Sequence, residues 1–298
     1  MRDIAIIGSG PAGLSASVYA TRAGLSTFVY SGKTSGGLLT TTDQVDNYLG
    51  LPGSTGMGMA KTFLDHATKL GAQFISGSAL EITREADGSF LIQDDLGSAE
   101  HYRAVVFSAG SQPRKLGVPG EDLEGVSWCA VCDGTFSEGE EVIVVGGGES
   151  AVEEAVYMSN IAAKVTVLLR GAEFRANKPA VEALLSKPNV EVRYETSILE
   201  IVGDEAVESA KLSDGSNLPV YSIFEAIGQV PQSHVAEGHA SIHPDGFIQH
   251  SETEGFFVAG DVADPEYRQI AIAVGDGAKA AIDAIRWLQM SPNAAPAS

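Results

Sequence analysis

The 298-residue chain has little cysteine, little positive charge and no long apolar run. Its two cysteines are too few for a structural disulfide framework, and they do not by themselves complete a zinc site. Only 19 basic residues stand against 39 acidic ones, and the net charge of -20 disfavours binding to nucleic acids and anionic membranes. No stretch approaches the roughly 20 consecutive apolar residues that a bilayer-spanning helix requires.

The sequence predicts regular secondary structure close to its first residue. Residues 4–7 form an apolar run typical of a buried strand and lead directly into a glycine turn, which leaves no room for a secretion signal. The length and the hydrophobic content of 44% predict about two domains of ordinary soluble type. The scarcity of cysteine suits a reducing compartment, so we expect a cytoplasmic protein. From the negative charge and the lack of a long apolar run, we expect it to bind neither nucleic acid nor membrane.

The chain does contain a Cys-x-x-Cys pair, Cys129 and Cys132, followed by Asp133 and Gly134. Residues three apart on a helical turn share a face, so the two sulfurs can form a disulfide or separate as two thiols. A helix N-terminus, which Ser127 would cap, lowers the pKa of a nearby thiol and favours the reactive thiolate. The alternatives are a structural disulfide or half of a zinc site. A loop this short constrains the unfolded chain little, and there is no second cysteine pair, so the pattern favours redox function.

One supersecondary unit occurs twice. A strand at residues 4–7, a glycine turn at 8–13, a helix that ends at about residue 22 and a strand at about 27–30 are predicted. The same elements follow as a strand at 142–145, a glycine turn at 146–151, a helix that ends at about residue 158 and a strand at 165–169. In each turn the first glycine bends the chain, the second lets the backbone approach a pyrophosphate, and the third position must be small. The helix N-terminus then faces the phosphates. Two such turns, each between a strand and a helix, predict an α/β fold with two Rossmann-like, three-layer dinucleotide-binding domains rather than accidental glycine-rich turns.

The residue at the end of each second strand helps to discriminate between ligands. After the second glycine turn this strand ends at Leu169-Arg170, with Arg175 close behind and no carboxylate placed to grip a ribose diol. Arginine favours a 2′-phosphate and therefore NADPH over NADH. Glu173 lies nearby, and solvated or paired surface arginines are the alternative. At the first site the corresponding residues are Tyr30 and Ser31, and neither is acidic, so the residue at the strand end does not indicate which dinucleotide binds there.

Several motifs in this order resemble bacterial low-molecular-weight thioredoxin reductases, a family of homodimeric FAD-containing pyridine nucleotide-disulfide oxidoreductases, over nearly the whole chain. The motifs are the two glycine turns, Gly36-Gly37-Leu38-Leu39-Thr40-Thr41-Thr42, Val45-Asp46-Asn47, Cys129-Ala130-Val131-Cys132-Asp133-Gly134, Ile227-Gly228-Gln229-Val230-Pro231, Gly260-Asp261-Val262 and Tyr267-Arg268-Gln269-Ile270-Ala271. The resemblance implies a discontinuous FAD domain, residues 1–112 and 243–298. An NAD(P)H domain with the cysteine pair, residues 113–242, would be inserted into it.

The resemblance also implies site residues. Those for FAD are Gly8, Gly10, Pro11, Ala12, Gly13, Gly37, Leu38, Asn47, Gly110, Gly260, Asp261, Arg268, Gln269 and Ile270. Those for NADPH are Gly146, Gly148, Glu149, Ser150, Ala151, Arg170, Arg175, Ile227 and Gly228. Cys129, Cys132 and the proton-transferring Asp133 would be catalytic. No metal site is expected, because no pattern of Asp, Glu or Cys residues adds further ligands to the pair His239 and His243.

Two departures from the family pattern bear on ligand choice. The family usually carries two consecutive arginines for the 2′-phosphate, whereas this chain has Arg170 followed by Gly171, so NADH stays possible beside NADPH. Gln229 stands where many relatives have histidine.

The implied activity is electron transfer from NADPH through FAD and the cysteine pair to the disulfide of thioredoxin or a thioredoxin-like protein. The family's mechanism requires domain rotation, and we place the hinges near residues 111–113 and 238–243. The alternatives are a related flavin-dependent disulfide reductase or dithiol oxidase with another electron donor or acceptor, or a redox sensor without steady turnover.

Overall fold

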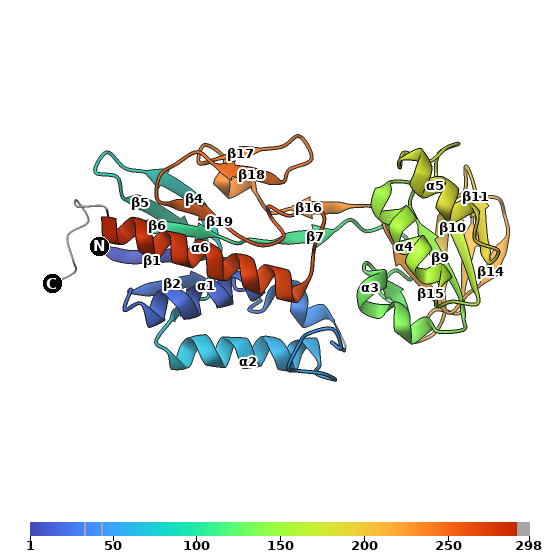
Figure 1. Cartoon of the computed structure of the whole chain (residues 1–298), viewed down its shortest axis with the longest axis horizontal. Coiled ribbons are helices and arrows are strands. Elements are labelled where there is room, and N and C mark those ends of the chain that lie inside the picture. The colour runs from blue at the N-terminus through green and yellow to red at the C-terminus, as the bar shows by residue number, and fades with distance from the viewer. Residues whose placement is uncertain (33, 43, 291–298) are drawn as a thin grey trace. The chain divides into compact units, whose positions relative to one another are not determined.

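The structure is a computed structural model that describes residues 1–32, 34–42 and 44–290 (Figure 1). It divides into two compact units. The first contains Met1–Gln112 and the chain from Val230 onward, and the second contains Pro113–Gln229. One unit is therefore inserted into the other. The first boundary coincides with the expected one at residues 112 and 113, whereas the second lies between residues 229 and 230 and not between 242 and 243.

The segment at residues 238–243, where the sequence predicts a hinge, packs inside the first unit. The His239 ring stacks on Phe256 with 5.2 Å between centroids, and its Nε2 lies 2.7 Å from the carbonyl oxygen of Ile82. Ala236 and Ala240 belong to the same buried apolar cluster as Phe256. Moving this segment would expose that cluster, so the chain passes between the units earlier.

The two connections between the units are β7 (Ser111–Pro113) and β16 (Gln229–Pro231), which pair with each other. The first connection lies where the sequence predicts a hinge. The second begins at the glutamine that departs from the family pattern.

The first unit has one large sheet. Its strands are β1 (Arg2–Ile7), β2 (Thr27–Tyr30), β3 (Gln73–Ile75), β4 (Ala79–Arg84), β5 (Phe90–Asp94), β6 (Ala99–Phe107) and β19 (Phe256–Val258). The order is β3-β2-β1-β6-β5-β4, and β19 pairs with β6. β1 is parallel to β2 and β6, whereas β5 is antiparallel to β6. The parallel centre of this sheet is covered on both faces, which explains the nearly continuous apolar run of β1.

The helices of the first unit are α1 (Pro11–Arg22), α2 (Gly56–Lys69) and α6 (Ile270–Met290), with short 3-10 helices η1 (Gly37–Thr41) and η3 (His234–Ala236). α1 and α6 pack against each other and, through small buried side chains, against one face of the sheet (Figure 1). The contact is so close that a Cβ at Gly277 of α6 would collide with the carbonyl oxygen of Ala12 in α1. The other face is covered by apolar side chains that include those of β4, β5, β17 (Ala240–Ile242) and β18 (Ile248–Ser251).

The second unit has a fully parallel sheet in the order β11-β10-β9-β15-β8. Its strands are β8 (Val126–Ser127), β9 (Glu141–Val145), β10 (Lys164–Leu168), β11 (Val190–Arg193) and β15 (Ser222–Glu225). A small antiparallel sheet contains β12 (Ile198–Val202), β13 (Ser209–Leu212) and β14 (Asn217–Pro219). The helices are α3 (Ala130–Asp133), α4 (Glu149–Ser159), α5 (Lys178–Leu185) and the 3-10 helix η2 (Gly134–Ser137).

Two apolar clusters lie on opposite faces of this parallel sheet. One joins its strands to α3, α4 and α5, and the other joins them to the antiparallel sheet. The result is a second three-layer unit, as the repeated motif predicts. None of the helices in the described ranges is long and apolar enough to cross a membrane.

Candidate active site

The first glycine turn leaves space for a ligand at one position and none at two others. Gly8 has a φ of 106°, and a Cβ there would collide with the carbonyl oxygen of Ser108. A Cβ at Gly13 would collide with the carbonyl oxygen of Gly8, whereas a Cβ at Gly10 would have no atom within 4 Å. Gly10 is also the N-cap of α1 and has no side-chain hydrogen bond there. Open space beside uncapped helix amides is what a pyrophosphate requires.

Two other sequence-predicted segments border this turn, and a third packs on a neighbouring apolar cluster. A Cβ at Gly37 would lie 3.1 Å from the Cα of Gly10, and a Cβ at Gly260 would lie 2.8 Å from the Cβ of Ala12. Ile270, at the start of α6, packs on the apolar cluster of η1 and α2. The close approach of these segments explains why glycine occupies positions 37 and 260.

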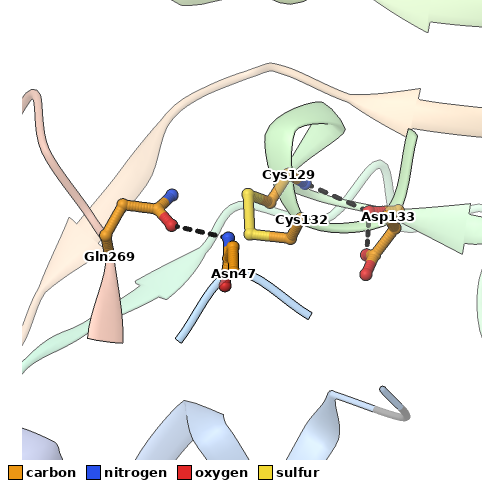
Figure 2. Close-up of a disulfide and its surroundings, with 6 residues drawn as sticks. Asn47, Cys129, Cys132, Asp133 and Gln269 are labelled. Carbon is orange, nitrogen blue, oxygen red and sulfur yellow. Dashed lines mark hydrogen bonds between the residues drawn. A yellow bond between two sulfur atoms is a disulfide. The ribbon is translucent and has the colours of Figure 1, made fainter. Parts of the chain in front are cut away.

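Asn47 and Gln269 meet although they are far apart in the sequence. The side-chain amide of Asn47 donates to Oε1 of Gln269 at 3.1 Å (Figure 2). Their neighbour Arg268 donates from Nη1 to the carbonyl oxygen of Pro265 at 2.8 Å. Leu38 is 39% exposed, and Gly110 adopts a φ of 73°.

Asp261 is a partly buried carboxyl directly after Gly260. Burial raises its pKa to about 6, and the negative charge of Asp264 adds to this effect, whereas Arg268 opposes it. A largely desolvated carboxyl favours hydrogen-bonding partners. Hydroxyl groups of a ribityl or ribose chain are suitable donors.

The second glycine turn repeats this geometry with one change. Gly146 has a φ of 144°, and a Cβ there would collide with the carbonyl oxygen of Ala226, which precedes the Ile227-Gly228 segment. A Cβ at Gly148 would have no atom within 4 Å, so space for a pyrophosphate exists here too.

The third position of the second turn is Ala151, which is fully buried in α4, two residues after Glu149 and directly after Ser150. Glu149 does not project freely toward this space. Its carboxylate accepts from the backbone N–H of Asn177 at 2.7 Å and from Nδ2 of Asn177 at 2.8 Å.

Arg170 and Arg175 provide the cationic groups near this turn. Arg170 follows Leu169 at the end of β10, and the backbone N–H of Arg175 donates to the carbonyl oxygen of Gly147 at 2.7 Å. Both side chains are exposed, and within the described ranges neither has an ion pair or side-chain hydrogen bond. They are available to an anion.

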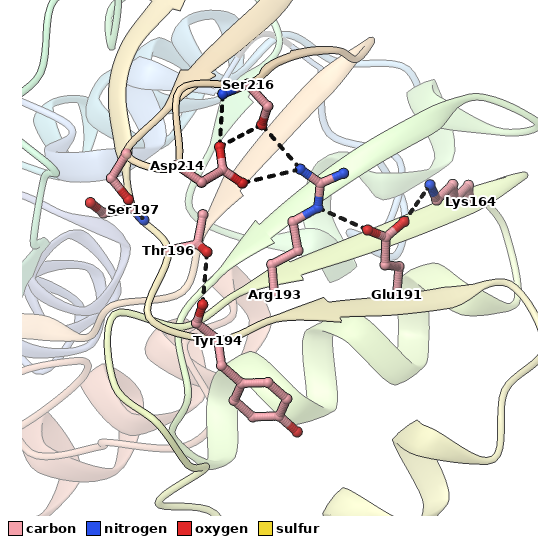
Figure 3. Close-up of polar contacts among 9 residues, drawn as sticks. Lys164, Glu191, Arg193, Tyr194, Thr196, Ser197, Asp214 and Ser216 are labelled. Atoms are coloured by element: carbon pink, nitrogen blue, oxygen red, sulfur yellow. Dashed lines mark hydrogen bonds and ion pairs between the residues drawn. The ribbon is translucent and has the colours of Figure 1, made fainter.

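Arg193 in the same unit is different, because it is already paired (Figure 3). Its Nε donates to Oε1 of Glu191 at 2.8 Å, and Nη1 lies 3.7 Å from Oδ2 of Asp214. Lys164 binds the other oxygen of Glu191 at 2.6 Å. This network joins β10 and β11 to the β13–β14 turn and leaves Arg193 unsuited to hold a phosphate.

Cys129 and Cys132 form a disulfide with 5.3 Å between their Cα atoms, as the spacing predicts (Figure 2). Cys129 is the N-cap of the four-residue helix α3. Its carbonyl oxygen accepts from the backbone N–H groups of Cys132 at 3.0 Å and Asp133 at 3.1 Å. Both cysteines are partly exposed, and Val131 and Phe136 beside them are about half-exposed.

We expected Ser127 to cap α3, but the N-cap residue is Cys129. Its Oγ accepts from the backbone N–H of Cys129 at 3.1 Å and donates to Oδ2 of Asp133 at 2.6 Å. The serine therefore bridges the two ends of the redox turn and fixes the Asp133 carboxylate. Sequence reasoning missed this bridge and the Asn177–Glu149 contact, although an asparagine before Lys-Pro is a recognisable helix-start signal.

Known proteins match these features. The model of the family described as "Pyridine nucleotide-disulphide oxidoreductase" matches residues 2–277. The chain belongs to this family. Thioredoxin reductase of Mycolicibacterium smegmatis is 37% identical over 97% of this chain and 97% of its own length. Thioredoxin reductase of Bacillus subtilis is 36% identical over 94% of this chain and 92% of its own length.

A solved structure agrees with this assignment. That of thioredoxin reductase from Giardia duodenalis matches with a TM-score of 0.91 and 35% identity, covering 97% of this chain and 99% of its own. The predicted family and the fold class with two Rossmann-like domains are confirmed by these matches. The predicted site residues stay predictions, supported by the geometry above.

Proposed function

We propose that the protein is an NADPH-dependent thioredoxin reductase with FAD as its prosthetic group. The observation that carries this function is the partly exposed Cys129–Cys132 disulfide, which lies in the unit that contains the second glycine turn. Full-length similarity to thioredoxin reductases supports it.

The first unit holds FAD. The uncapped first turn of α1 and the open space at Gly10 take the pyrophosphate, and Asp261 accepts hydrogen bonds from hydroxyl groups of the cofactor. Asn47 and Gln269, already bonded to each other, lie at the flavin end. When bound, FAD accepts a hydride and passes two electrons to a disulfide.

The second unit holds NADPH. Its pyrophosphate occupies the open space at Gly148, and its 2′-phosphate pairs with Arg170 and Arg175. Gly171 provides no third cation, so phosphate recognition depends on two separate guanidinium groups.

The cysteine pair carries out thiol–disulfide exchange. In the reduced pair, one thiolate attacks a sulfur of the acceptor disulfide, forming a mixed disulfide and releasing the other acceptor sulfur as a thiolate. The second cysteine then attacks the mixed disulfide, which restores the Cys129–Cys132 bond and frees the acceptor as a dithiol. Asp133, fixed by Ser127, supplies or accepts the accompanying proton.

The acceptor is thioredoxin or a thioredoxin-like protein, and the enzyme is a cytoplasmic homodimer. Large apolar side chains that are exposed in the single chain support dimer formation, since Leu49 is 97%, Tyr267 64% and Met57 59% exposed. Light scattering of the holoenzyme should give the mass of two chains. The mass of one chain would contradict the dimer.

The function is tested by steady-state oxidation of NADPH with oxidised thioredoxin as acceptor. Turnover is expected to require thioredoxin and to give one thioredoxin dithiol per NADPH consumed. If oxygen is consumed with a dithiol donor in the absence of NADPH, the protein is a dithiol oxidase. If NADPH is oxidised for one equivalent only, the pair acts as a sensor.

A further inference from the structure

Glu225 is a buried carboxyl at the end of an inner strand of the parallel sheet in the second unit. It ends β15, lies opposite Val145 of β9, and is 2% exposed. Its Oε2 accepts from the indole Nε1–H of Trp128 at 3.0 Å and from the backbone N–H of Leu116 at 3.3 Å. Its Oε1 has no hydrogen-bond partner among the residues described.

Fold stability does not account for a carboxyl at this position. Ile223, two residues earlier and therefore on the same face of the strand, belongs to an apolar cluster with Val145. A buried carboxyl with one unsatisfied oxygen costs free energy that an apolar side chain would not. Consistently, burial raises the pKa of Glu225, although the bonds from Trp128 and Leu116 oppose the shift.

The group that Glu225 holds is next to the redox-active pair. Trp128 directly precedes Cys129, and its ring also lies 5.4 Å from the ammonium of Lys115, measured to the ring centroid. Lys115 is itself paired with Asp122 at 2.6 Å. The indole is therefore restrained at its N–H by a buried acceptor and near its ring by a paired cation.

The redox turn is thus restrained from two directions. Ser127 links the backbone N–H of Cys129 to the carboxylate of Asp133 within the turn. The indole of Trp128, the residue before Cys129, is bonded to Glu225 of β15, which lies between β9 and β8 in the sheet. With these restraints in place, Cys129 and Cys132 are joined.

We propose that Glu225 is a positioning residue for the redox-active pair. By holding the Trp128 indole, it keeps the backbone of Cys129 in the arrangement that the disulfide requires and so favours the disulfide over the dithiol. A disulfide is compatible with a narrow range of Cα and Cβ positions, whereas two thiols tolerate a wider range. Releasing the indole therefore increases the freedom of the dithiol more than that of the disulfide. The inference rests on the proposed function only in that the pair is redox-active.

The test is the equilibrium between the pair and a dithiol buffer, measured on the holoenzyme. Under anaerobic conditions the protein disulfide and reduced dithiothreitol exchange to give the protein dithiol and oxidised dithiothreitol. After acid quenching, the free thiols are alkylated and counted by mass spectrometry. The readout is direct because the chain has only 2 cysteines.

Four variants separate positioning from charge. Trp128→Phe keeps an aromatic ring but loses the N–H, and Glu225→Val removes the acceptor. Each should shift the equilibrium constant toward the dithiol by about threefold or more, the effect expected for loss of one hydrogen bond. Glu225→Gln keeps a carbonyl acceptor and should stay within about twofold of the parent. The matched control is Glu121→Gln, which removes a charge that acts on Glu225 but does not bond the indole.

Two further measurements guard against a general loss of structure. The double variant Trp128→Phe with Glu225→Val should shift the equilibrium no further than either single change. Thermal unfolding of Glu225→Val should stay cooperative and occur close to the temperature of the parent, because loss of a half-satisfied buried carboxyl offsets the loss of its bonds from Trp128 and Leu116. If Glu225→Val does not fold, the comparison of Trp128→Phe with Glu225→Gln decides.

The proposal is overturned if Trp128→Phe leaves the equilibrium unchanged, or if Glu225→Gln shifts it as much as Trp128→Phe. An equal shift in Glu121→Gln would also overturn it, since charge alone would then explain the effect. Failure of the proposed function appears separately, as an unaltered protein that does not reduce thioredoxin with NADPH. That result would leave the equilibrium measurements valid.

Discussion

The two units build the same strand–turn–helix element but complete it differently. In both, the first glycine has a positive φ and the second leaves open space at the helix N-terminus. The third position is Gly13 in the first unit, where no Cβ fits, and the buried Ala151 in the second. The second strand is followed by Ser31 in one and by Leu169 and Arg170 in the other.

The comparison indicates that the glycine turn can bind the pyrophosphate of any dinucleotide, whereas side chains outside the turn determine which dinucleotide binds. In the proposed function, those of the first unit come from distant segments such as Asn47, Asp261 and Gln269. In the second, the cations directly follow the second strand. Only the second unit adds sulfur chemistry, so electrons leave the protein from there.

The largest effect is expected when a cysteine is replaced, because this removes the sulfur chemistry and leaves both dinucleotide sites intact. Cys129→Ser or Cys132→Ser should lower thioredoxin reduction by about a thousandfold or more, because exchange needs one sulfur to attack and one to resolve. FAD content and flavin bleaching by NADPH should be unchanged, as measured by anaerobic absorbance. Loss of bleaching in these variants would mean that the cysteines are required at an earlier step.

The second prediction exchanges the third positions of the two turns. Gly13→Ala should destabilise the first unit by about 2–3 kcal/mol and release FAD, because the new Cβ collides with the backbone of Gly8. Ala151→Gly should cost only about 1 kcal/mol and leave FAD bound. Thermal unfolding and flavin absorbance measure both. Equal losses of stability in the two variants would contradict this prediction, because they would show that the third position is packed alike in both turns.

The third prediction concerns the cations of the second unit. Arg170→Ala with Arg175→Ala should raise the KM for NADPH about tenfold and leave that for NADH nearly unchanged, because only NADPH has a 2′-phosphate. Gly171→Arg should lower the KM for NADPH, since a Cβ there has no neighbour closer than 3.9 Å. The already paired Arg193 serves as the control. An equal effect of Arg193→Ala would contradict the assignment.

The smallest expected effect is a pH dependence in the first unit. Burial raises the pKa of Asp261 to about 6 in the folded protein, whereas the pKa of an unburied Asp is 3.8. Between these values the folded state binds more protons, so the free energy of unfolding falls as the pH rises. For FAD-free protein the fall from pH 5 to pH 7 should be about 1 kcal/mol. Asp261→Asn should remove this part of the slope in denaturant titrations, and an unaltered slope would contradict it.

Local elements were predictable from the sequence because their signals are local. The glycine turns and their flanking strands lie where periodicity and spacing place them, and α1 ends at Arg22 as expected. The compact units divide between residues 229 and 230 and not near residue 243, because the packing of His239 on Phe256 depends on a distant strand. No local pattern distinguishes such a buried loop from a linker.

The same limit applies to the redox turn. Cys-x-x-Cys predicts a disulfide, but the bridge from Ser127 to Asp133 and the bond from Trp128 to Glu225 depend on tertiary structure. A single acidic residue in the apolar run before Ile227 is a signal that sequence reasoning can use, because carboxyls are rarely buried without a reason.

The most direct test of the central claim is one anaerobic titration of the holoenzyme. NADPH should bleach the flavin absorbance of the first unit, and oxidised thioredoxin added afterwards should restore it, with one thioredoxin reduced per flavin restored. Bleaching that thioredoxin does not reverse would contradict the account, because electrons would then enter the protein without leaving through Cys129 and Cys132.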